Sequence, residues 1–277
     1  MSSWLIYGAQ GWIGNYFCSQ LKCKILQPTS RADDPEGVAK DLDNLKPNRV
    51  LSFIGRTSGP GCSTIDYLED KLEMNLRDNL YSPIILMKLC ADRNIHFTYL
   101  GTGCIFSYET PDDDEFTEDS KPNFFGSAYS TVKGFTDQLT KLFPNTLNVR
   151  IRMPIVSNDC SKNFISKIIR YPKILNTLNS MSVLPDLIPY LIESVQSGRV
   201  GTIDLVNPGP IDHVTILELY KKYVDPEHTY TLVNESEHDS MLKSKRSKNC
   251  LRPTFDAPNT LDSIEKIFQS DKFVKPN

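Results

Sequence analysis

Tyr129 and Lys133 are the two residues whose types and spacing most directly indicate chemistry. Residues four apart share one face of a helix, so the two side chains are expected to be neighbours. An ammonium beside a phenol favours the phenolate, and Lys133 is therefore predicted to lower the pKa of Tyr129 toward neutrality. A phenol tuned in this way can give a proton to a carbonyl oxygen while a hydride reaches the carbonyl carbon.

A source of hydride is predicted at the start of the chain. Gly8, Gly11 and Gly14 follow the apolar run Trp4–Tyr7 and open the helical pattern Trp12–Leu21. In dinucleotide sites the first glycine permits a tight turn, the second lets the backbone approach the pyrophosphate, and the third allows close helix packing. The helix N-terminus then faces the phosphates. A purely structural turn is the less favoured alternative. The predicted cofactor contacts are Gly8, Gln10, Gly11, Trp12, Ile13, Gly14, Arg31, Gly55, Tyr129 and Lys133.

The end of the second predicted strand indicates which nicotinamide cofactor binds. NAD enzymes usually carry an acidic residue there to hold the ribose hydroxyls. Here the segment 26–31 contains none, and Ser30 and Arg31 could instead meet a 2′-phosphate. NADPH is therefore favoured and NADH stays possible. Arg31 as an ordinary surface residue is the alternative.

The fourth predicted strand ends at a further pair of candidate residues, Thr102 and Cys104. Side chains alternate along a strand, so both are expected on the same side. Ligands bind at the carboxyl ends of strands in open α/β sheets. Thr102 could hydrogen-bond the substrate carbonyl beside Tyr129. We interpret Cys104 as a catalytic acid rather than as a small buried hydrophobe.

The order of apolar runs and helical patterns predicts the fold that must position these residues. Strand and helix signals alternate over the first half, which indicates a parallel sheet. We predict an α/β fold: a Rossmann-type doubly wound parallel sheet with a smaller C-terminal substrate-binding lobe. Residues 1–155 are assigned to the NADP-binding domain, with the Tyr–Lys helix at 128–143. Residues 156–277 are mainly the substrate lobe, with some segments returning to the sheet. The stretch 67–92 is predicted as helix with a kink or restart at Pro83.

Bulk properties exclude several classes of protein. A chain of 277 residues can form one large domain and a smaller lobe. A net charge of −3 does not suggest a nucleic-acid or membrane-surface partner. No apolar stretch approaches the ~20 residues of a membrane span, and no signal peptide is recognised. Seven scattered cysteines without Cys-x-x-Cys favour a reducing, cytoplasmic location. The four histidines lack metal spacing, so no metal site is predicted.

Two charged segments are predicted to be solvated surface. One is the acidic loop containing Glu109, Asp112, Asp113, Asp114, Glu115, Glu118 and Asp119. The other is a basic run formed by Lys243, Lys245, Arg246 and Lys248, for which a phosphate contact is the alternative.

The glycine turn, the Thr102 strand end and the Tyr129–Lys133 pair together resemble an extended short-chain dehydrogenase/reductase. More narrowly, the chain is similar to the bifunctional 3,5-epimerase/4-reductase of UDP-L-rhamnose synthesis, also found as the C-terminal part of plant rhamnose synthases. The similarity runs from about residue 4 to about residue 225. The segments that carry it are 101–106, 122–127, 150–155, 163–167, 179–184 and 207–209.

This resemblance implies two reactions on UDP-4-keto-6-deoxy-glucose. A cysteine and a lysine of the family share the proton transfers at C3 and C5, and they match Cys104 and Lys167; which is acid and which is base stays open. NADPH-dependent reduction at C4 follows, with Tyr129 as proton donor, Thr102 positioning the oxygen and Lys133 holding the nicotinamide ribose. The implied substrate contacts are Thr57, Thr102, Cys104 and Asn163. UDP or dTDP on the sugar is not decided, and a homodimer is possible.

Two other functions remain open. A dTDP-4-dehydrorhamnose-type reductase would catalyse only the ketone reduction and would not need Cys104 and Lys167. A non-enzymatic NADP-binding regulatory subunit could share the fold, but it would have no use for the proton donor Tyr129. Similarity of fold alone does not separate these functions.

Overall fold

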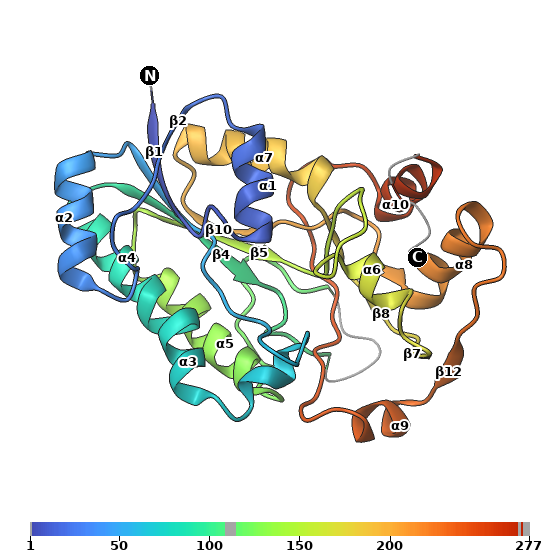
Figure 1. Ribbon diagram of the computed structural model, residues 1–277. Coiled ribbons are helices and arrows are strands. Elements are labelled where there is room, and N and C mark those ends of the chain that lie inside the picture. The colour runs from blue at the N-terminus through green and yellow to red at the C-terminus, as the bar shows by residue number, and fades with distance from the viewer. Residues whose placement is uncertain (1, 109–114, 271–272, 274–277) are drawn as a thin grey trace.

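A parallel sheet of six strands forms the centre of the molecule, in the order β10-β5-β4-β3-β1-β2 (Figure 1). The computed structural model describes residues 2–108, 115–270 and 273, so the part of the acidic loop at 109–114 lies outside the described residues. Every neighbouring pair in this sheet runs parallel. The strands are β1 (Ser3–Tyr7), β2 (Lys24–Leu26), β3 (Arg49–Ser52), β4 (His96–Thr102), β5 (Thr146–Ile151) and β10 (Gly201–Asp204).

Helices cover both faces of the sheet, which explains why its strands are apolar on both sides. Within β1, Trp4 and Ile6 pack into the cluster beneath α1 (Trp12–Gln20) and α7 (Leu184–Ser197). Leu5 and Tyr7 point to the opposite face, under α2 (Pro35–Leu45) and α4 (Ser82–Ala91). Figure 1 shows α1 and α7 on one side and α2, α4 and α5 (Ala128–Thr140) on the other. The predicted doubly wound fold is confirmed.

The stretch predicted as one kinked helix is divided into four pieces. A 3-10 helix (η1, Ile65–Leu68) and α3 (Leu72–Leu76) precede a π-helix (η2, Arg77–Tyr81), and α4 follows. Pro83 lies in the first turn of α4 and has no N–H to give to the Asn79 carbonyl. The Thr136 hydroxyl of α5 donates to that carbonyl at 2.7 Å instead. The proline thus restarts the helix, and a side chain from α5 replaces the missing hydrogen bond.

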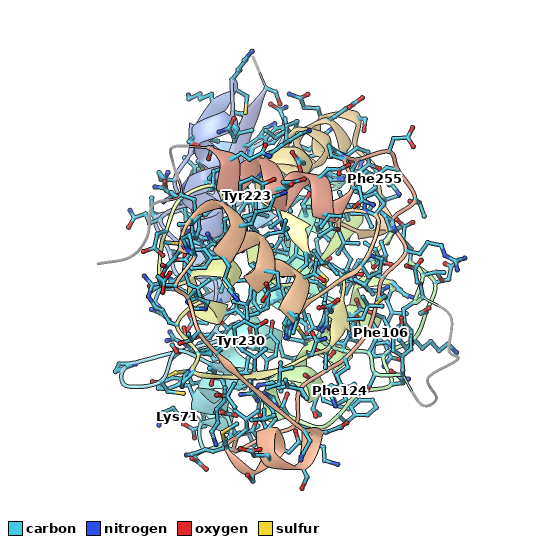
Figure 2. All side chains as sticks on the ribbon, turned by 90° about the vertical axis from the view of Figure 1, so that its right-hand side faces the viewer. Lys71, Phe106, Phe124, Tyr223, Tyr230 and Phe255 are labelled. Carbon is cyan, nitrogen blue, oxygen red and sulfur yellow. The ribbon has the colours of Figure 1, made fainter. Side chains whose placement is uncertain are left out.

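The second half of the chain contributes to both the sheet and a smaller lobe. β10 pairs with β5 and α7 packs against α1, so these segments belong to the sheet layers. The smaller lobe has its own apolar core, in which Ile165, Ile216 and Ile267 are buried. Figure 2 views the molecule from this side, where Tyr223 and Tyr230 are labelled. The domain boundary at residues 155–156 stays a prediction. The helices of the lobe are α6 (Phe164–Ile168), α8 (His213–Tyr223), α9 (Glu235–Ser240) and α10 (Thr260–Gln269).

Short paired strands connect the parts of the smaller lobe, and sequence patterns did not predict them. Three two-stranded sheets form by the pairing of β6 with β9, β7 with β12, and β8 with β11. Segments of two or three residues are too short to show a period of two. Their bounds are Pro154–Ile155 (β6), Lys173–Leu175 (β7), Leu178–Asn179 (β8), Ser182–Val183 (β9), Ile211–Asp212 (β11) and Thr231–Val233 (β12).

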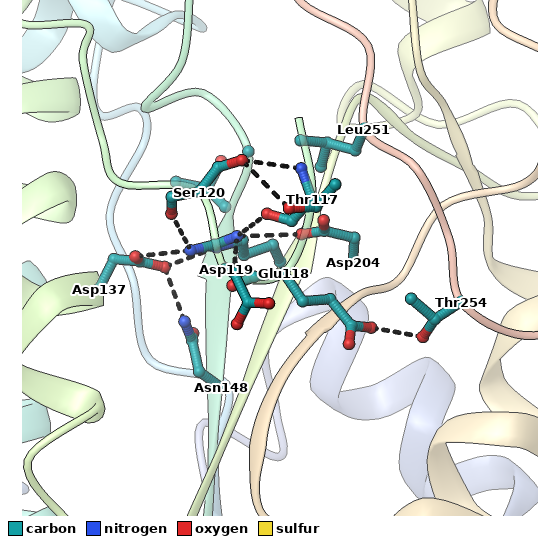
Figure 3. Close-up of polar contacts among 12 residues, drawn as sticks. Thr117, Glu118, Asp119, Ser120, Asp137, Asn148, Asp204, Leu251 and Thr254 are labelled. Atoms are coloured by element: carbon teal, nitrogen blue, oxygen red, sulfur yellow. Dashed lines mark hydrogen bonds and ion pairs between the residues drawn. The ribbon is translucent and has the colours of Figure 1, made fainter. Parts of the chain in front are cut away.

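A buried ionic network around Arg150 joins the sheet to the helix that carries Tyr129 (Figure 3). The Arg150 guanidinium donates to both carboxylate oxygens of Asp137 on α5, at 2.8 and 2.9 Å. It lies 3.4 Å from the carboxylate of Asp204 on β10 and donates 3.1 Å to the Thr117 carbonyl. Burial raises the pKa of Asp204 to about 7 even though Arg150 opposes the shift. The network therefore fixes α5 against β5 and β10.

Replacing Arg150 with methionine should destabilise the protein strongly. It would leave Asp137 and Asp204 buried without their cation, and breaking one side of a buried ion pair costs about 3–5 kcal/mol. We expect a loss of this size in the free energy of unfolding, measured by urea denaturation. Arg93→Met is the matched control, because Arg93 pairs with the exposed Asp43 and its loss should leave stability nearly unchanged. Equal effects of the two changes would contradict the prediction.

Candidate active site

The glycine turn at the end of β1 has the geometry that a dinucleotide needs. Gly8 has a φ of +78°, and a Cβ there would lie 3.0 Å from the Ile54 nitrogen. A Cβ on Gly14 would lie 2.2 Å from the Gly8 oxygen, so only glycine lets α1 pack this close to the turn. Gly11 is the N-cap of α1 and offers no side-chain acceptor to the first amides of the helix. These free donors can meet a pyrophosphate, so the residues present fit the predicted cofactor.

The other residues predicted at this turn lie around it. Gln10 is exposed, whereas Trp12 and Ile13 are half-buried and pack against the core under α1. Gly55 is exposed at the end of β3, and the next amide, that of Arg56, donates to the Asn79 side chain at 3.0 Å. Their contacts with a cofactor stay predictions.

Arg31 lies in a charged chain beyond the end of β2. Its guanidinium is 72% exposed and lies 2.9 Å from the carboxylate of Asp33. Arg77 lies 3.8 Å from the same carboxylate and 2.8 Å from Asp78, which in turn pairs with Arg56 at 2.5 Å. Three arginines thus share two carboxylates, leaving one positive charge beside the glycine-turn edge of the sheet. Sequence reasoning missed Arg77, because it lies inside a helical stretch without any local signal.

Asp41 holds the segment that carries Arg31 in place. Its carboxylate accepts hydrogen bonds from the backbone amides of Thr29 and Ser30, each at 3.0 Å. The two hydroxyls donate to it as well, at 2.5 and 2.7 Å. The segment after β2 is therefore fixed by a buried residue of α2.

At the end of β4 the structure brings Thr102, Cys104 and Tyr129 together. The Cys104 amide donates to the Thr102 hydroxyl oxygen at 3.0 Å. Thr102 and Cys104 both lie close enough to the Tyr129 phenol to influence its pKa, Thr102 lowering it and Cys104 raising it. Thr102 and Tyr129 are buried, whereas Cys104 is half-buried. A hydroxyl, a thiol and a phenol thus line one spot at the carboxyl edge of the sheet.

The start of α5 places Tyr129 at that spot. The Ser127 hydroxyl oxygen accepts a hydrogen bond from the Ser130 amide at 3.0 Å and caps the helix. Glu69, from a distant segment, accepts a second hydrogen bond from the Ala128 amide at 3.0 Å. Ser127 is recognisable in the sequence as a helix cap, whereas Glu69 is not.

Lys133 does not act on Tyr129 as predicted. Its ammonium donates to the Tyr99 hydroxyl and, at 3.2 Å, to the Leu100 carbonyl. Burial lowers the pKa of Lys133 to about 7, against the opposing influence of Asp137 and Cys104. The pKa of Tyr129 is raised rather than lowered, because burial and the neighbouring Cys104 outweigh the Thr102 hydrogen bond and the Arg152 charge. The expectation of a phenol with a near-neutral pKa is wrong, but a phenol that stays protonated is suited to donate a proton.

Lys167 and Asn163 belong to α6 in the smaller lobe. The Lys167 ammonium donates to the Ser63 carbonyl at 3.3 Å, and burial lowers its pKa. Among the described contacts its partner is thus the loop after β3 rather than Cys104. Asn163 is the N-cap of α6, and its amide group also donates to the Val156 and Asn158 carbonyls at 2.9 Å. Roles in catalysis and substrate binding, including that of the exposed Thr57, stay predictions.

Arg152 and the C-terminal segment also reach this spot, and sequence reasoning missed both. Arg152 donates to the Cys104 sulfur at 3.1 Å. Asn249 donates to the carbonyls of Gly103 and Phe106 at 2.9 and 2.8 Å and so fixes the loop that carries Cys104. Figure 2 labels Phe106 on the face where the C-terminal segment passes. The only sequence signal was the motif Arg150–Ile155, which does not indicate a partner for Arg152.

The described residues contain no group of three or more His, Cys, Asp or Glu side chains placed to hold a metal ion. No helix within them is long and apolar enough to cross a membrane.

Several known proteins are similar to this chain in sequence and structure. The crystal structure of the L780 UDP-rhamnose synthase from Acanthamoeba polyphaga mimivirus matches with a TM-score of 0.93 at 42% identity, covering 96% of this chain and 98% of that chain. A bifunctional dTDP-4-dehydrorhamnose 3,5-epimerase/dTDP-4-dehydrorhamnose reductase of Arabidopsis thaliana is 32% identical over 91% of this chain and 85% of its own length. The dTDP-4-dehydrorhamnose reductase of Bacillus anthracis, solved in complex with NADP, shares the fold (TM-score 0.80, 15% identity, 97% and 99% coverage). No protein-family model matches the chain.

A Rossmann sheet with a thiol beside a Thr–Tyr pair defines an enzyme of the short-chain dehydrogenase/reductase type. At this level of similarity, the chain belongs to the family of rhamnose-forming nucleotide-sugar 3,5-epimerase/4-reductases. The family resemblance found in the sequence is thereby confirmed.

Proposed function

We propose that this protein is an NADPH-dependent 3,5-epimerase/4-ketoreductase that converts UDP-4-keto-6-deoxy-D-glucose to UDP-L-rhamnose. The observation that carries the proposal is the position of Cys104 beside the Thr102–Tyr129 pair. A thiol at that position can exchange protons on carbons next to the same ketone that the phenol helps to reduce. UDP rather than dTDP is favoured by the similarity to a UDP-rhamnose synthase.

Epimerisation uses the acidity of the protons beside the C4 ketone. A base removes the proton from C3 or C5, and the electron pair moves to the ketone oxygen as an enolate. An acid then returns a proton to the carbon from the opposite face. We assign these transfers to Cys104 and Lys167. Burial lowers the pKa of Lys167, which makes it a better proton donor than a solvated lysine.

Reduction removes the ketone and must therefore come last. Bound NADPH supplies the hydride, and the glycine turn with the N-terminus of α1 would hold its pyrophosphate. Tyr129 gives its proton to the C4 oxygen, and Thr102 orients that oxygen through its hydroxyl. Lys133 lies one turn after Tyr129 on the same helix, and its buried amine would hold the nicotinamide ribose. A reductase alone would not need Cys104 or Lys167.

Isotope exchange tests the proposed function. Purified protein is incubated with UDP-4-keto-6-deoxy-glucose in deuterated water, first without and then with NADPH. We expect deuterium at C3 and C5 without cofactor and UDP-rhamnose with it, both followed by NMR and mass spectrometry. Reduction of a pre-epimerised sugar without any exchange would instead identify a monofunctional reductase. Repeating the assay with the dTDP sugar compares the two nucleotides.

The preference for NADPH should depend on Arg31. Replacing it with alanine removes a charged hydrogen-bond donor for the 2′-phosphate, and for an exposed group we expect an increase on the order of 10-fold in the KM for NADPH. The KM for NADH should not change, because NADH has no phosphate at that position. Arg93→Ala, at an exposed ion pair elsewhere, is the control. Equal changes for both cofactors would contradict a phosphate contact.

We also infer a homodimer, formed through α3 and α5. These neighbouring helices carry or adjoin large apolar side chains that are exposed in the single chain: Leu72 (59%), Phe135 (54%) and Leu142 (73%). Light scattering at micromolar concentration should give twice the 31.4 kDa of one chain. The double change L72E/F135E should give the monomer mass. A wild-type protein that already has the monomer mass would refute the dimer.

A cytoplasmic location is inferred from the cysteines. All seven are free in the structure, and unpaired thiols persist in reducing compartments.

A further inference from the structure

Arg152 is a fully buried guanidinium without a carboxylate partner among the described residues. It lies between β5 and β6 and is 1% exposed. One terminal nitrogen donates to the Cys104 sulfur at 3.1 Å and to the Ser247 hydroxyl at 3.2 Å. The other donates to the Asn179 side-chain oxygen, and Nε has no hydrogen-bond partner within the described part of the chain. Arg150, two residues earlier, shows the usual arrangement, because it faces Asp137 and Asp204.

A buried cation of this kind needs a counter-charge. Transfer of an isolated charge from water to the protein interior costs several kcal/mol after relaxation. Asn179 and Ser247 are neutral and supply only dipoles. Among the side chains that accept hydrogen bonds from Arg152, Cys104 is the one that can become an anion by losing a proton. The other titratable groups that face this pair are Tyr129 and Lys133, which interact with Cys104, and Cys250, which interacts with Arg152. A separation of 3.1 Å is short for a sulfur acceptor, and cations beside a cysteine favour the thiolate.

We propose that Arg152 is the positioning residue of the epimerase step: its guanidinium holds the Cys104 sulfur in place as a thiolate, which makes Cys104 the base. This inference rests on the proposed function. It gives Cys104 the opposite role to the catalytic acid that its place in the sequence suggested. Lys167 is then the proton donor on the other face of the sugar.

Residues near Arg152 in the structure fix the direction of its side chain toward Cys104. Gly103 leaves room for both Leu251 and Arg152, since a Cβ there would lie 2.5 Å from the Leu251 side chain and 2.9 Å from the Arg152 side-chain carbons. Met153 has a φ of +39°, which is costly for a residue with a side chain and turns the backbone directly after Arg152. Ser182 fixes the backbone of Arg152 itself. Its hydroxyl oxygen accepts a hydrogen bond from the Arg152 amide at 2.9 Å, and its own amide donates to the Arg152 carbonyl at 2.8 Å.

The proton transfer balances with these groups. The substrate C–H bond breaks and an S–H bond forms on Cys104, while the electron pair moves to the C4 oxygen. One negative charge passes from the sulfur to the enolate oxygen, and the charge of Arg152 is unchanged. The Lys167 ammonium then gives a proton to the carbon. Exchange of both groups with water restores the thiolate and the ammonium and labels the sugar in deuterated water.

The pH dependence of alkylation tests the inference without any substrate. The full-length protein is treated with iodoacetamide across a pH series, and carboxamidomethylation of the Cys104 peptide is followed by mass spectrometry. In Arg152→Met the half-maximal rate should move upward by at least about one pH unit, a tenfold lower reactivity in the acidic range. Arg152→Lys keeps the charge and should retain most of the wild-type profile. Cys18, which belongs to α1 and packs against the apolar cluster beneath that helix, serves as internal reference and should not change.

Two further measurements distinguish a failure of this inference from misfolding of the variant and from a failure of the proposed function. Gly103→Ala should displace the guanidinium without removing it and should move the Cys104 profile in the same direction, which covers the case that Arg152→Met does not fold. Deuterium exchange at C3 and C5 should fall at least about tenfold at neutral pH in Arg152→Met and recover as the pH rises. Identical Cys104 profiles in the wild type and in Arg152→Met would overturn the inference. The alkylation profile of Cys104 could depend on Arg152 in a protein that never exchanges the C3 and C5 protons of the sugar. That result would contradict the proposed function but not the contact between Arg152 and Cys104.

Discussion

Replacing Cys104 with alanine is expected to abolish deuterium exchange at C3 and C5 of the 4-keto sugar. The side chain would no longer move protons to or from these carbons, and loss of a positioned acid or base typically costs about 10²–10⁴-fold in rate. The reduction of an already epimerised sugar should survive, because Thr102 and Tyr129 remain. NMR detection of deuterium and a separate NADPH-oxidation assay measure the two activities independently.

The matched control for this change is Cys18→Ala. Cys18 belongs to α1 and packs against an apolar cluster that does not include Thr102 or Tyr129, so its loss should leave exchange intact. If Cys104→Ala exchanges protons as fast as the wild type, the bifunctional assignment is wrong, and a simple reductase becomes the better description.

Tyr129→Phe is expected to have the complementary effect. Without the phenol no proton reaches the C4 oxygen, so NADPH-dependent reduction should fall by about 10²–10⁴-fold. Exchange at C3 and C5 should continue, because Cys104 and Lys167 are unchanged. The product of a long incubation should therefore be a deuterated keto sugar rather than UDP-rhamnose.

A second tyrosine provides the comparison for this variant. Tyr81, half exposed in the π-helix, can be changed to phenylalanine without touching the site, and both activities should persist. Loss of exchange together with reduction in Tyr129→Phe would mean that the phenol also serves the epimerase step, so that Cys104 and Tyr129 would not have separate roles.

Much of the predicted cofactor site and of the sheet around it could be recognised from the sequence, because the residues of each motif lie within a few positions of one another. The glycine turn joins β1 to α1 within a few residues, and Ser127 caps α5 directly before Tyr129. Propensity, capping and helical periodicity act over such short distances and leave a readable pattern. The predicted order of strands and helices in the first half therefore agrees with the sheet, apart from the four pieces between 65 and 92.

The electrostatics of the site could not be predicted in the same way. Lys133 and Tyr129 share a helix, yet the ammonium donates to Tyr99 on the neighbouring strand. Spacing along a helix brings two side chains near one another but does not decide which partner each one chooses. Burial then moved the pKa of Tyr129 in the direction opposite to the one expected. Both effects depend on what packs against the helix, which its own sequence does not contain.

The sequence by itself determined the class of chemistry: a nicotinamide site, a proton-donating phenol and a thiol at the end of a strand. Only the tertiary structure decided how these groups are charged and held. It placed Arg152 against Cys104, 48 residues away along the chain, and brought Asn249 from the C-terminal segment under the same loop. Contacts of this kind arise from the packing of separate strands and lobes. They have no fixed spacing, and a single sequence therefore carries no pattern from which they could be recognised.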